Sequence, residues 1–273
     1  MKKTIITLLG IALLLMIPVN SWAQTSFKNT LKTAKKGDAV AQTQVGNSYF
    51  YGKGVRKSYK KAAKWYKKAA AQDNITAQFN LGVSYFFGDG VRRNYEQAVE
   101  CFAKAANKNH PKAQFFLGYC YANGCGVEED KDAAVKWYKK AADQGVAEAQ
   151  NNLGVCYYKG DGVARKNYST AGELFAKASQ QELAAGRNNL GLMYYYGEGV
   201  TSRPNLRRAF SLFSLAADQG YAPAQYNMGV CWNEAIGVPG NDPQQAKEYF
   251  QKAARQGHED AKAALERLKA EGR

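Results

Sequence analysis

The chain has 273 residues and a formal net charge of +15, which is unevenly distributed along it. Residues 24–74 hold 12 basic and two acidic residues, whereas residues 75–273 carry a net charge of only +3. A local patch of this kind suits an anionic partner, and because no recognised nucleic-acid-binding motif accompanies it, nucleic acid is excluded from the expected partners.

Residues 1–23 have the three parts of a secretory signal peptide. Two lysines near the start precede an apolar run from Ile5 to Ile17, and a short segment ending in Ala23 precedes Gln24. A run of about 13 residues is too short to span a bilayer comfortably. We therefore predict cleavage near Ala23 and an exported mature protein, periplasmic or secreted, without a transmembrane helix. An uncleaved anchor is the alternative.

A hydrophobic residue followed by glycine recurs six times along the rest of the chain. The pairs are Val45-Gly46, Leu81-Gly82, Leu117-Gly118, Leu153-Gly154, Leu190-Gly191 and Met228-Gly229, at steps of 36, 36, 36, 37 and 38 residues. A period of this size predicts a solenoid built from pairs of helices.

The first helix of each copy, helix A, is predicted to run from an Ala-Gln pair to an aromatic residue. In the second copy Ala77, Leu81 and Tyr85 are spaced four residues apart and therefore lie on one helical face. Gly88 then ends the helix, because glycine readily adopts the left-handed conformation that closes one. A second glycine, Gly90, lets the chain reverse.

The second helix, helix B, is predicted to begin in every copy after a residue that can cap a helix N-terminus. These residues are Ser58, Asn94, Asp130, Asn167, Asn205 and Asp242. In the first copy large rings alternate with alanines at Ala62, Trp65, Tyr66 and Ala69, a pattern that suits interlocking helices. The extra residues of the longer copies all fall in the turn between helices A and B, as stacked repeats require.

The pattern A-Q-x-x-L-G-x-x-Y-x-x-G-x-G-V, followed by a cap and then A-x-x-W-x-x-x-A-A-x-x-G, resembles the Sel-1-like repeat family, relatives of the tetratricopeptide repeats. The resemblance implies an all-α, right-handed α-solenoid of about six helix-turn-helix repeats with a capping helix at each end. After the signal peptide (1–23) the solenoid would occupy residues 24–273, with a capping helix at 24–37, repeats at about 38–73, 74–109, 110–145, 146–182, 183–220 and 221–257, and a capping helix at 260–270.

Superposition of the Leu-Gly pair on the tetratricopeptide pattern predicts which side chains face the concave side. The predicted peptide-binding residues are Phe50, Tyr51, Phe79, Phe86, Phe87, Phe115, Tyr119, Asn151, Tyr158, Asn188, Tyr195, Tyr196 and Tyr226. Aromatic rings would supply contact area for an extended peptide, and asparagine amides would pair with its backbone. The alternative is that many of these side chains are buried between neighbouring helices.

Six lysines fall within about 120° on one side of the first helix B, opposite its apolar stripe. They are Lys57, Lys60, Lys61, Lys64, Lys67 and Lys68. This side of the helix is either a solvated face or a contact for an anionic partner, such as lipid headgroups, acidic glycans or an acidic protein.

No set of residues assembles catalytic machinery, a metal site or a cofactor site. The two histidines, His110 and His258, occupy equivalent connections several repeats apart, so they do not share a metal ion. The Gly-x-Gly-Val segments recur from repeat to repeat and lack the Lys-Ser/Thr tail of a phosphate loop. Because the number of cysteines, five, is odd, at least one thiol is unpaired within the chain. The sequence leaves a Cys120–Cys125 disulfide as one possibility.

The expected function is that of an exported, noncatalytic protein–protein interaction module, an adaptor or scaffold that binds a peptide or protein on its concave face. One alternative is a cell-envelope enzyme or small-ligand binder that acts on cell-wall material. A compact pocket with converging ionisable groups of perturbed pKa would favour this alternative. A second alternative is a surface-associated scaffold that uses the basic first repeat.

Overall fold

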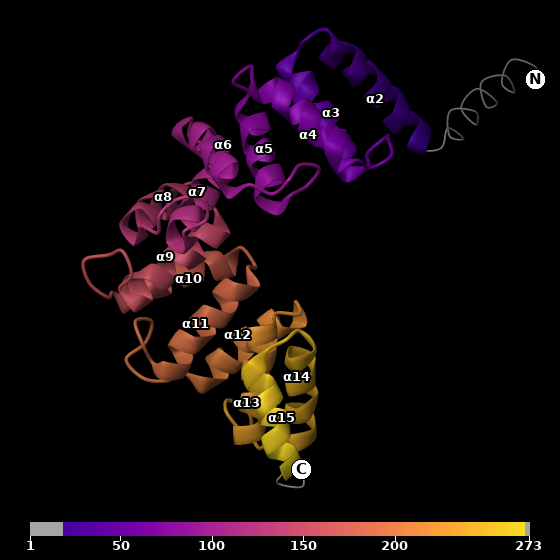
Figure 1. The fold of residues 1–273 in the computed structure, drawn as a ribbon. Coiled ribbons are helices and arrows are strands. Elements are labelled where there is room, and N and C mark those ends of the chain that lie inside the picture. The colour runs from indigo at the N-terminus through magenta and orange to yellow at the C-terminus, as the bar shows by residue number, and fades with distance from the viewer. Residues whose placement is uncertain (1–18, 271–273) are drawn as a thin grey trace, which may run out of the picture. The chain divides into compact units, whose positions relative to one another are not determined.

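The computed structural model describes residues 19–270, and within that range it contains 14 helices and no strand (Figure 1). Residues 1–18, which hold most of the predicted signal peptide, lie outside the described residues. The chain divides into two compact units, residues 1–129 and residues 130–273. No described helix is both long enough and apolar enough to cross a membrane.

Helices A and B alternate along both units, and each helix packs on the next one within its unit. The first unit contains α2 (Val19–Lys35), α3 (Ala39–Tyr51), α4 (Tyr59–Ala70), α5 (Ile75–Phe87), α6 (Tyr95–Asn107) and α7 (Pro111–Asn123). The second contains α8 (Lys131–Asp143), α9 (Ala147–Lys159), α10 (Tyr168–Gln180), α11 (Ala184–Tyr196), α12 (Leu206–Asp218), α13 (Ala222–Glu234), α14 (Pro243–Arg255) and α15 (Glu259–Ala270). The odd-numbered helices from α3 to α13 are helices A. The predicted all-α solenoid of helix pairs is confirmed.

The predicted helix ends are also confirmed by their local geometry. Each of the six helix B caps accepts a hydrogen bond from the backbone N–H three residues later, as Asn94 does from Gln97 at 2.9 Å. At the end of α5, Gly88 has a φ of 82°, in the left-handed region. In the sixth copy Ala235 takes the same conformation, with a φ of 56°, although its Cβ makes that conformation costly.

In five of the six copies the glycine of the hydrophobic-glycine pair makes room for an aromatic ring of the paired helix B. A Cβ on Gly82 would lie 2.7 Å from the ring of Phe102, and a Cβ on Gly229 would lie 2.5 Å from the ring of Phe250. The same contact joins Gly46 to Tyr66, Gly154 to Phe175 and Gly191 to Phe213. Any larger residue would force the ring or the helix to move.

The second turn glycine joins one repeat to the repeat before it. Gly90 has a φ of 75° and lies so close to the backbone of Tyr59, the first residue of the preceding helix B, that no Cβ fits between them. Gly199 lies in the same way against Tyr168. The part of the A–B turn up to and including this glycine is therefore fixed against the preceding repeat, whereas the part after it is not fixed by this contact. This explains why the additional residues of the longer copies come only after it.

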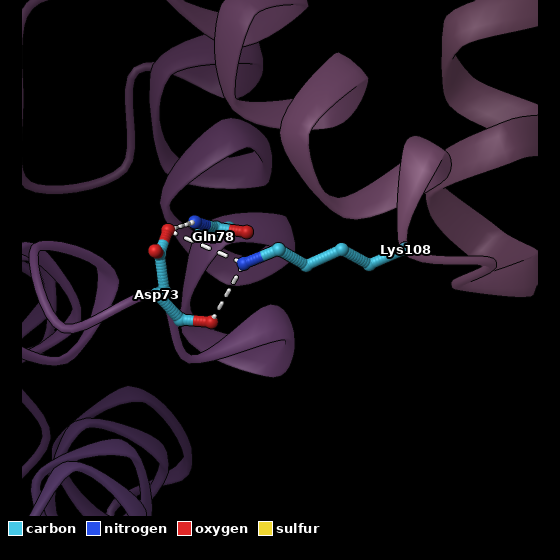
Figure 2. A network of polar contacts seen from close by, with 3 residues as sticks. All are labelled: Asp73, Gln78 and Lys108. Atoms are coloured by element: carbon cyan, nitrogen blue, oxygen red, sulfur yellow. Dashed lines mark hydrogen bonds and ion pairs between the residues drawn. The ribbon is translucent and has the colours of Figure 1, made fainter.

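Polar side chains link the B-to-A connections of adjacent repeats (Figure 2). Lys108 Nζ donates to the carbonyl oxygen of Asp73 at 3.2 Å and forms an ion pair with the Asp73 carboxylate, also at 3.2 Å. Gln78 Nε2 donates to the same carboxylate at 3.0 Å. The hydrogen bond from Lys108 is the main cause that lowers the pKa of Asp73. In the second unit, the equivalent side chains of Gln219 and Gln256 donate to the carbonyl oxygens of Glu182 and Gly220.

The glutamine of the Ala-Gln pair has a structural role that the repeat pattern alone did not reveal. Gln114 is buried, and its Nε2 donates to the carbonyl oxygen of Ala106 in the last turn of the preceding helix B at 3.3 Å. The same bond joins Gln42 to Ala34, Gln150 to Ala142 and Gln225 to Ala217. In the fifth copy Arg187 replaces the glutamine and instead pairs with Glu182 at 3.4 Å. Helix A thus adds a second hydrogen bond to a backbone carbonyl that already accepts one from the B-to-A connection, as Ala106 does from the Asn109 N–H at 3.0 Å.

The contact between Gly82 and Phe102 leads to a stability prediction. Gly82→Ala is expected to lower the free energy of unfolding by about 1–3 kcal/mol, because overpacking outweighs the better helix propensity of alanine. Gly82→Ala combined with Phe102→Leu should cost less than the two single losses added together, since leucine leaves room for the new methyl group. Urea unfolding of the three variants measures this coupling, and strictly additive losses would contradict the proposed contact.

Candidate functional site

A pocket of about 210 Å³ lies among the helices A of the first unit. Its walls include three of the predicted peptide-binding residues, Phe50, Tyr51 and Phe79, from α3 and α5. Val83 and Phe116 add apolar surface, while Asn80 and Lys112 supply polar groups. The pocket thus offers aromatic area with a few hydrogen-bond donors, a composition typical of peptide-binding surfaces.

Exposed rings at the ends of helices A are supported by a second ring. Tyr51 is 65% exposed, and its ring packs edge-on against Phe50 with the centroids 5.0 Å apart. The same arrangement recurs in the pairs Phe86–Phe87 and Tyr195–Tyr196, in which Phe87 is 58% and Tyr196 is 57% exposed. A ring that is already held in place loses little conformational freedom on binding, which favours it as a contact residue.

The predicted residues of the third repeat join an aromatic cluster in the first unit. Phe115 lies 5.4 Å and Phe86 lies 5.7 Å from Phe116, measured between ring centroids. Tyr119, which is 37% exposed, lies 6.0 Å from Phe86. Phe116 was not predicted as a site residue, yet it connects the rings of α5 to those of α7.

The second unit carries three pockets that share walls and form one aromatic trough. The first, of about 190 Å³, lies between α9 and α11 and includes Tyr158 and Tyr196. The second, of about 170 Å³, lies between α11 and α13 and is lined by Tyr195, Tyr196 and Tyr226. The third, of about 200 Å³, lies between α13 and α15 and again includes Tyr226. Four predicted residues therefore line a single surface.

Two other predicted residues, Asn151 and Asn188, are buried rather than available to a peptide. They are 8% and 4% exposed. Asn189 Nδ2 donates to Asn151 Oδ1 at 2.9 Å, and Asn227 Nδ2 donates to Asn188 Oδ1 at 2.8 Å. These amides join adjacent helices A, and the expectation that they pair with a ligand backbone does not match this geometry.

A recurring asparagine is the signal by which these contacts could have been found. The residue directly before the hydrophobic-glycine pair is asparagine in four copies: Asn80, Asn152, Asn189 and Asn227. In the first unit Asn80 Nδ2 donates to Asn47 Oδ1 at 3.0 Å, the same type of bond as in the second unit. This position faces the neighbouring helix A, whereas the predictions used the position one residue earlier.

Several phenols and a thiol that line the pockets hold their protons at neutral pH. Burial, followed by a hydrogen bond to Glu198 at 2.8 Å, raises the pKa of Tyr158 to about 12. Burial also raises the pKa of the Cys231 thiol to about 12 and raises the pKa of Tyr66. These phenols and this thiol therefore act as weak hydrogen-bond donors and not as activated nucleophiles.

The third pocket of the trough brings an acidic and a basic side chain together. Its walls hold Tyr226, Asn233, Glu234 and Arg267 beside the apolar Phe250. Burial raises the pKa of Tyr226, and the nearby carboxylates of Asp260 and Glu234 raise it further. Its phenol stays neutral, so the group can orient a ligand through a hydrogen bond but does not serve as a general base near pH 7.

Both histidines occupy packing positions at the start of a helix A or of α15. His110 Nδ1 accepts a hydrogen bond from the Ala113 N–H at 3.1 Å and so caps α7, and its ring stacks on Phe79 at 4.6 Å. His258 stacks on Tyr226 at 4.8 Å. Each imidazole thus supports a ring that was predicted to contact a peptide, Phe79 or Tyr226. Among residues 19–270, no group of three His, Cys, Asp or Glu side chains could hold a metal ion.

The cysteines are all free thiols. Cys120 and Cys231 are buried, and Cys101 and Cys156 are half-buried. Cys125, which lies between the turn glycines Gly124 and Gly126, is also half-buried. Burial raises the pKa of Cys120 to about 12, so this thiol is unreactive near neutral pH.

The six predicted lysines lie on and just before α4 and are all exposed. We refer to Lys57, Lys60, Lys61, Lys64, Lys67 and Lys68 together as the α4 lysine face. The opposite side of α4 is buried through Ala62, Tyr66 and Ala69. The lysine face is therefore a surface separate from the pockets between helices A.

Comparison with known proteins identifies the repeat. The family model of the Sel1 repeat matches six consecutive segments, residues 39–74, 75–110, 111–146, 147–183, 184–221 and 222–258. The chain belongs to the Sel1 repeat family. Proteins built from Sel1 repeats are generally noncatalytic scaffolds for protein–protein interactions.

Solved structures agree with this assignment. A Sel1 repeat protein from Oxalobacter formigenes is 27% identical, has a TM-score of 0.78, and the match covers 85% of this chain and 91% of that one. A protective antigen of uropathogenic Escherichia coli, c5321, is 32% identical with a TM-score of 0.58, and the match covers 89% of this chain and 59% of that one. The Cut9–Hcn1 hetero-tetramer, at 17% identity and a TM-score of 0.58 over 89% of this chain and 45% of that one, shares the fold. A search of curated protein sequences gave no match.

The cap formed by His110 predicts a pH dependence of stability for this Sel1 repeat protein. Burial lowers the pKa of His110 below its usual 6.5, and only the neutral ring accepts the Ala113 hydrogen bond. Its contribution to stability is therefore complete above about pH 6.5 and is lost as the pH falls towards the lowered folded-state pKa. Asparagine caps a helix at every pH, so His110→Asn should remove this part of the dependence. His110→Ala should cost about 1 kcal/mol above pH 6.5 and less as the pH falls.

Thermal unfolding of the three proteins between pH 5 and pH 7.5 checks this prediction. Parallel stability curves for the original chain and the His110→Asn variant would show that His110 does not act as the neutral cap.

Proposed function

We propose that this Sel1 repeat protein is an exported scaffold that binds an extended segment of a partner protein along the exposed ends of its helices A, on the side that the repeat pattern predicts to be concave. The observation that carries the proposal is the recurrence of exposed, supported rings beside the pockets, at Tyr51 in the first unit and at Tyr196 in the second. Membership of a family of interaction scaffolds supports it.

The chemistry of the pockets favours binding over catalysis. Tyr158, Tyr226 and Cys231 retain their protons at neutral pH, so they offer contact area and single hydrogen bonds. The trough continues from pocket to pocket because Leu192 and Tyr196 line the first two, while Tyr226 and Val230 line the last two. A shared wall suits a chain of several residues better than a single compact ligand.

The partner-binding surface can be tested by photo-crosslinking from defined positions. A photoreactive phenylalanine analogue at Tyr196 is expected to capture a partner in cells, whereas the same analogue at Ser211, an exposed residue of the helix B α12, should not. With the captured partner purified, Tyr195→Ala together with Tyr196→Ala should weaken binding by at least about tenfold, since buried aromatic anchors dominate such interfaces. Equal capture from Tyr196 and Ser211 would contradict the proposal.

Export is supported by the charge and apolar pattern of residues 1–23, with cleavage proposed near Ala23. Intact mass of the native protein is expected to correspond to a chain that begins at Gln24, and the protein is expected in the cell-envelope or extracellular fraction. A mass that includes Met1 would show that the segment is retained. Recovery in the cytoplasm would argue against export.

A further inference from the structure

The α4 lysine face is an unpaired, single-sign surface. All six of its lysines are exposed, and among the described residues 19–270 none of them forms an ion pair. Helices α2, α3 and α4 contain no acidic residue. Four more exposed lysines, Lys28, Lys32, Lys35 and Lys36, lie on or just after α2. The start of the first unit therefore presents positive charge without compensating carboxylates on these helices.

Aromatic rings hold four of these ammonium groups at the surface. Lys57 Nζ lies 4.6 Å from the ring centroid of Tyr59, and Lys68 Nζ lies 4.8 Å from that of Trp65. Lys61 lies over Tyr49 of α3 at 5.3 Å, and Lys67 lies over Tyr85 of α5 at 5.6 Å. Cation–π contacts restrict the side chains while leaving their charge open to a partner. The lysines are therefore partly ordered before anything binds.

The repeats themselves show that the fold does not need these lysines. In α6, Glu96 and Glu100 occupy the positions of Lys60 and Lys64, yet α6 still has a capping residue, Asn94, and a buried stripe at the equivalent positions. Lysines four residues apart, such as Lys60 and Lys64, also repel each other and weaken a helix. The first repeat thus keeps a row of like charges that costs helix stability, which indicates a role outside folding.

The use of lysine rather than arginine indicates a partner whose negative charges are spread over a surface. All six residues are lysines, which act as separate point charges, whereas arginine would bind individual carboxylates or phosphates with two parallel bonds. None of the six lines any of the four pockets described above. The row runs the full length of α4, about 18 Å at 1.5 Å per residue. It suits an extended, negatively charged surface rather than one bound anion.

We propose that the α4 lysine face holds the scaffold against an anionic phospholipid membrane. The inference rests on the proposed export, because an exported protein crosses such a membrane and is released beside it. The apolar side of α4 is buried in the solenoid, so the helix lies on the headgroups without inserting. The attraction is electrostatic and falls steeply with salt, since the Debye length shrinks from about 10 Å at 0.1 M to about 3 Å at 1 M.

Vesicle sedimentation tests this proposal with the protein purified as the cell processes it. The probe is a vesicle made of equal parts of phosphatidylglycerol and phosphatidylcholine, compared with pure phosphatidylcholine. Binding is expected only to the anionic vesicle and should disappear at 1 M salt. Replacement of all six lysines by glutamine should weaken binding by more than about a hundredfold, since each lysine near an anionic bilayer contributes roughly a fivefold factor.

Helix α8 supplies a matched control. Lys136, Lys139 and Lys140 of α8 occupy the positions of Lys64, Lys67 and Lys68, and Lys140 lies over Trp137 at 4.1 Å as Lys68 lies over Trp65. Glutamine at the three α4 positions should weaken vesicle binding at least about tenfold, whereas glutamine at the three α8 positions should change it less than about twofold. Both variants alter the net charge equally, and circular dichroism checks that both are folded.

Equal losses in the α4 and α8 variants would overturn the proposal, because net charge alone would then explain binding. Equal binding to neutral vesicles would also overturn it. Binding to polyglutamate that requires the α4 lysines, without binding to anionic vesicles, would assign the face to an acidic protein instead. Crosslinking from Tyr196 uses different residues, so failure of membrane binding and failure of partner binding can be told apart.

Discussion

In five of the six repeats the close approach of the two helices depends on a glycine in the middle of helix A. Gly82 has no side chain, and the ring of Phe102 from the paired helix occupies the space that a Cβ would need. With that side of helix A in contact with helix B, a second side meets the neighbouring helix A through bonds such as Asn80 to Asn47. Only the remaining side, near the helix C-terminus, is left to present rings such as Tyr51.

The two kinds of helix consequently present different chemistry. Helices A expose aromatic rings beside shallow pockets, whereas the first helix B exposes lysines and buries its apolar stripe. The pockets contain phenols and thiols whose pKa values burial raises, so these groups are neutral near pH 7. A scaffold of this kind can combine a salt-insensitive contact on helices A with a salt-sensitive contact on α4, because the two use separate residues.

Helix boundaries could be predicted from the sequence because they depend on local chemistry. Asn94 caps α6 and Gly88 closes α5 through bonds to residues within a few positions. A capping residue starts helix B in all six copies, and a glycine ends helix A in the first five. Exposure could not be predicted in the same way. Asn151 and Tyr158 were both assigned to the binding face, but Asn151 is buried because its partner, Asn189, lies 38 residues away on the next helix A. Phe116 was missed because asparagine holds its position in most other copies.

The contact between each turn glycine and the preceding helix B has a consequence for how such chains change over evolution. Gly90 lies against Tyr59, and Gly199 lies against Tyr168, so every junction is made from the same kinds of atoms at the same repeat positions. If recombination added or removed one whole repeat in frame, the repeats on either side of the change would still form this same contact with each other. The number of repeats, and with it the length of partner that can be bound, can therefore vary without any new junction being invented.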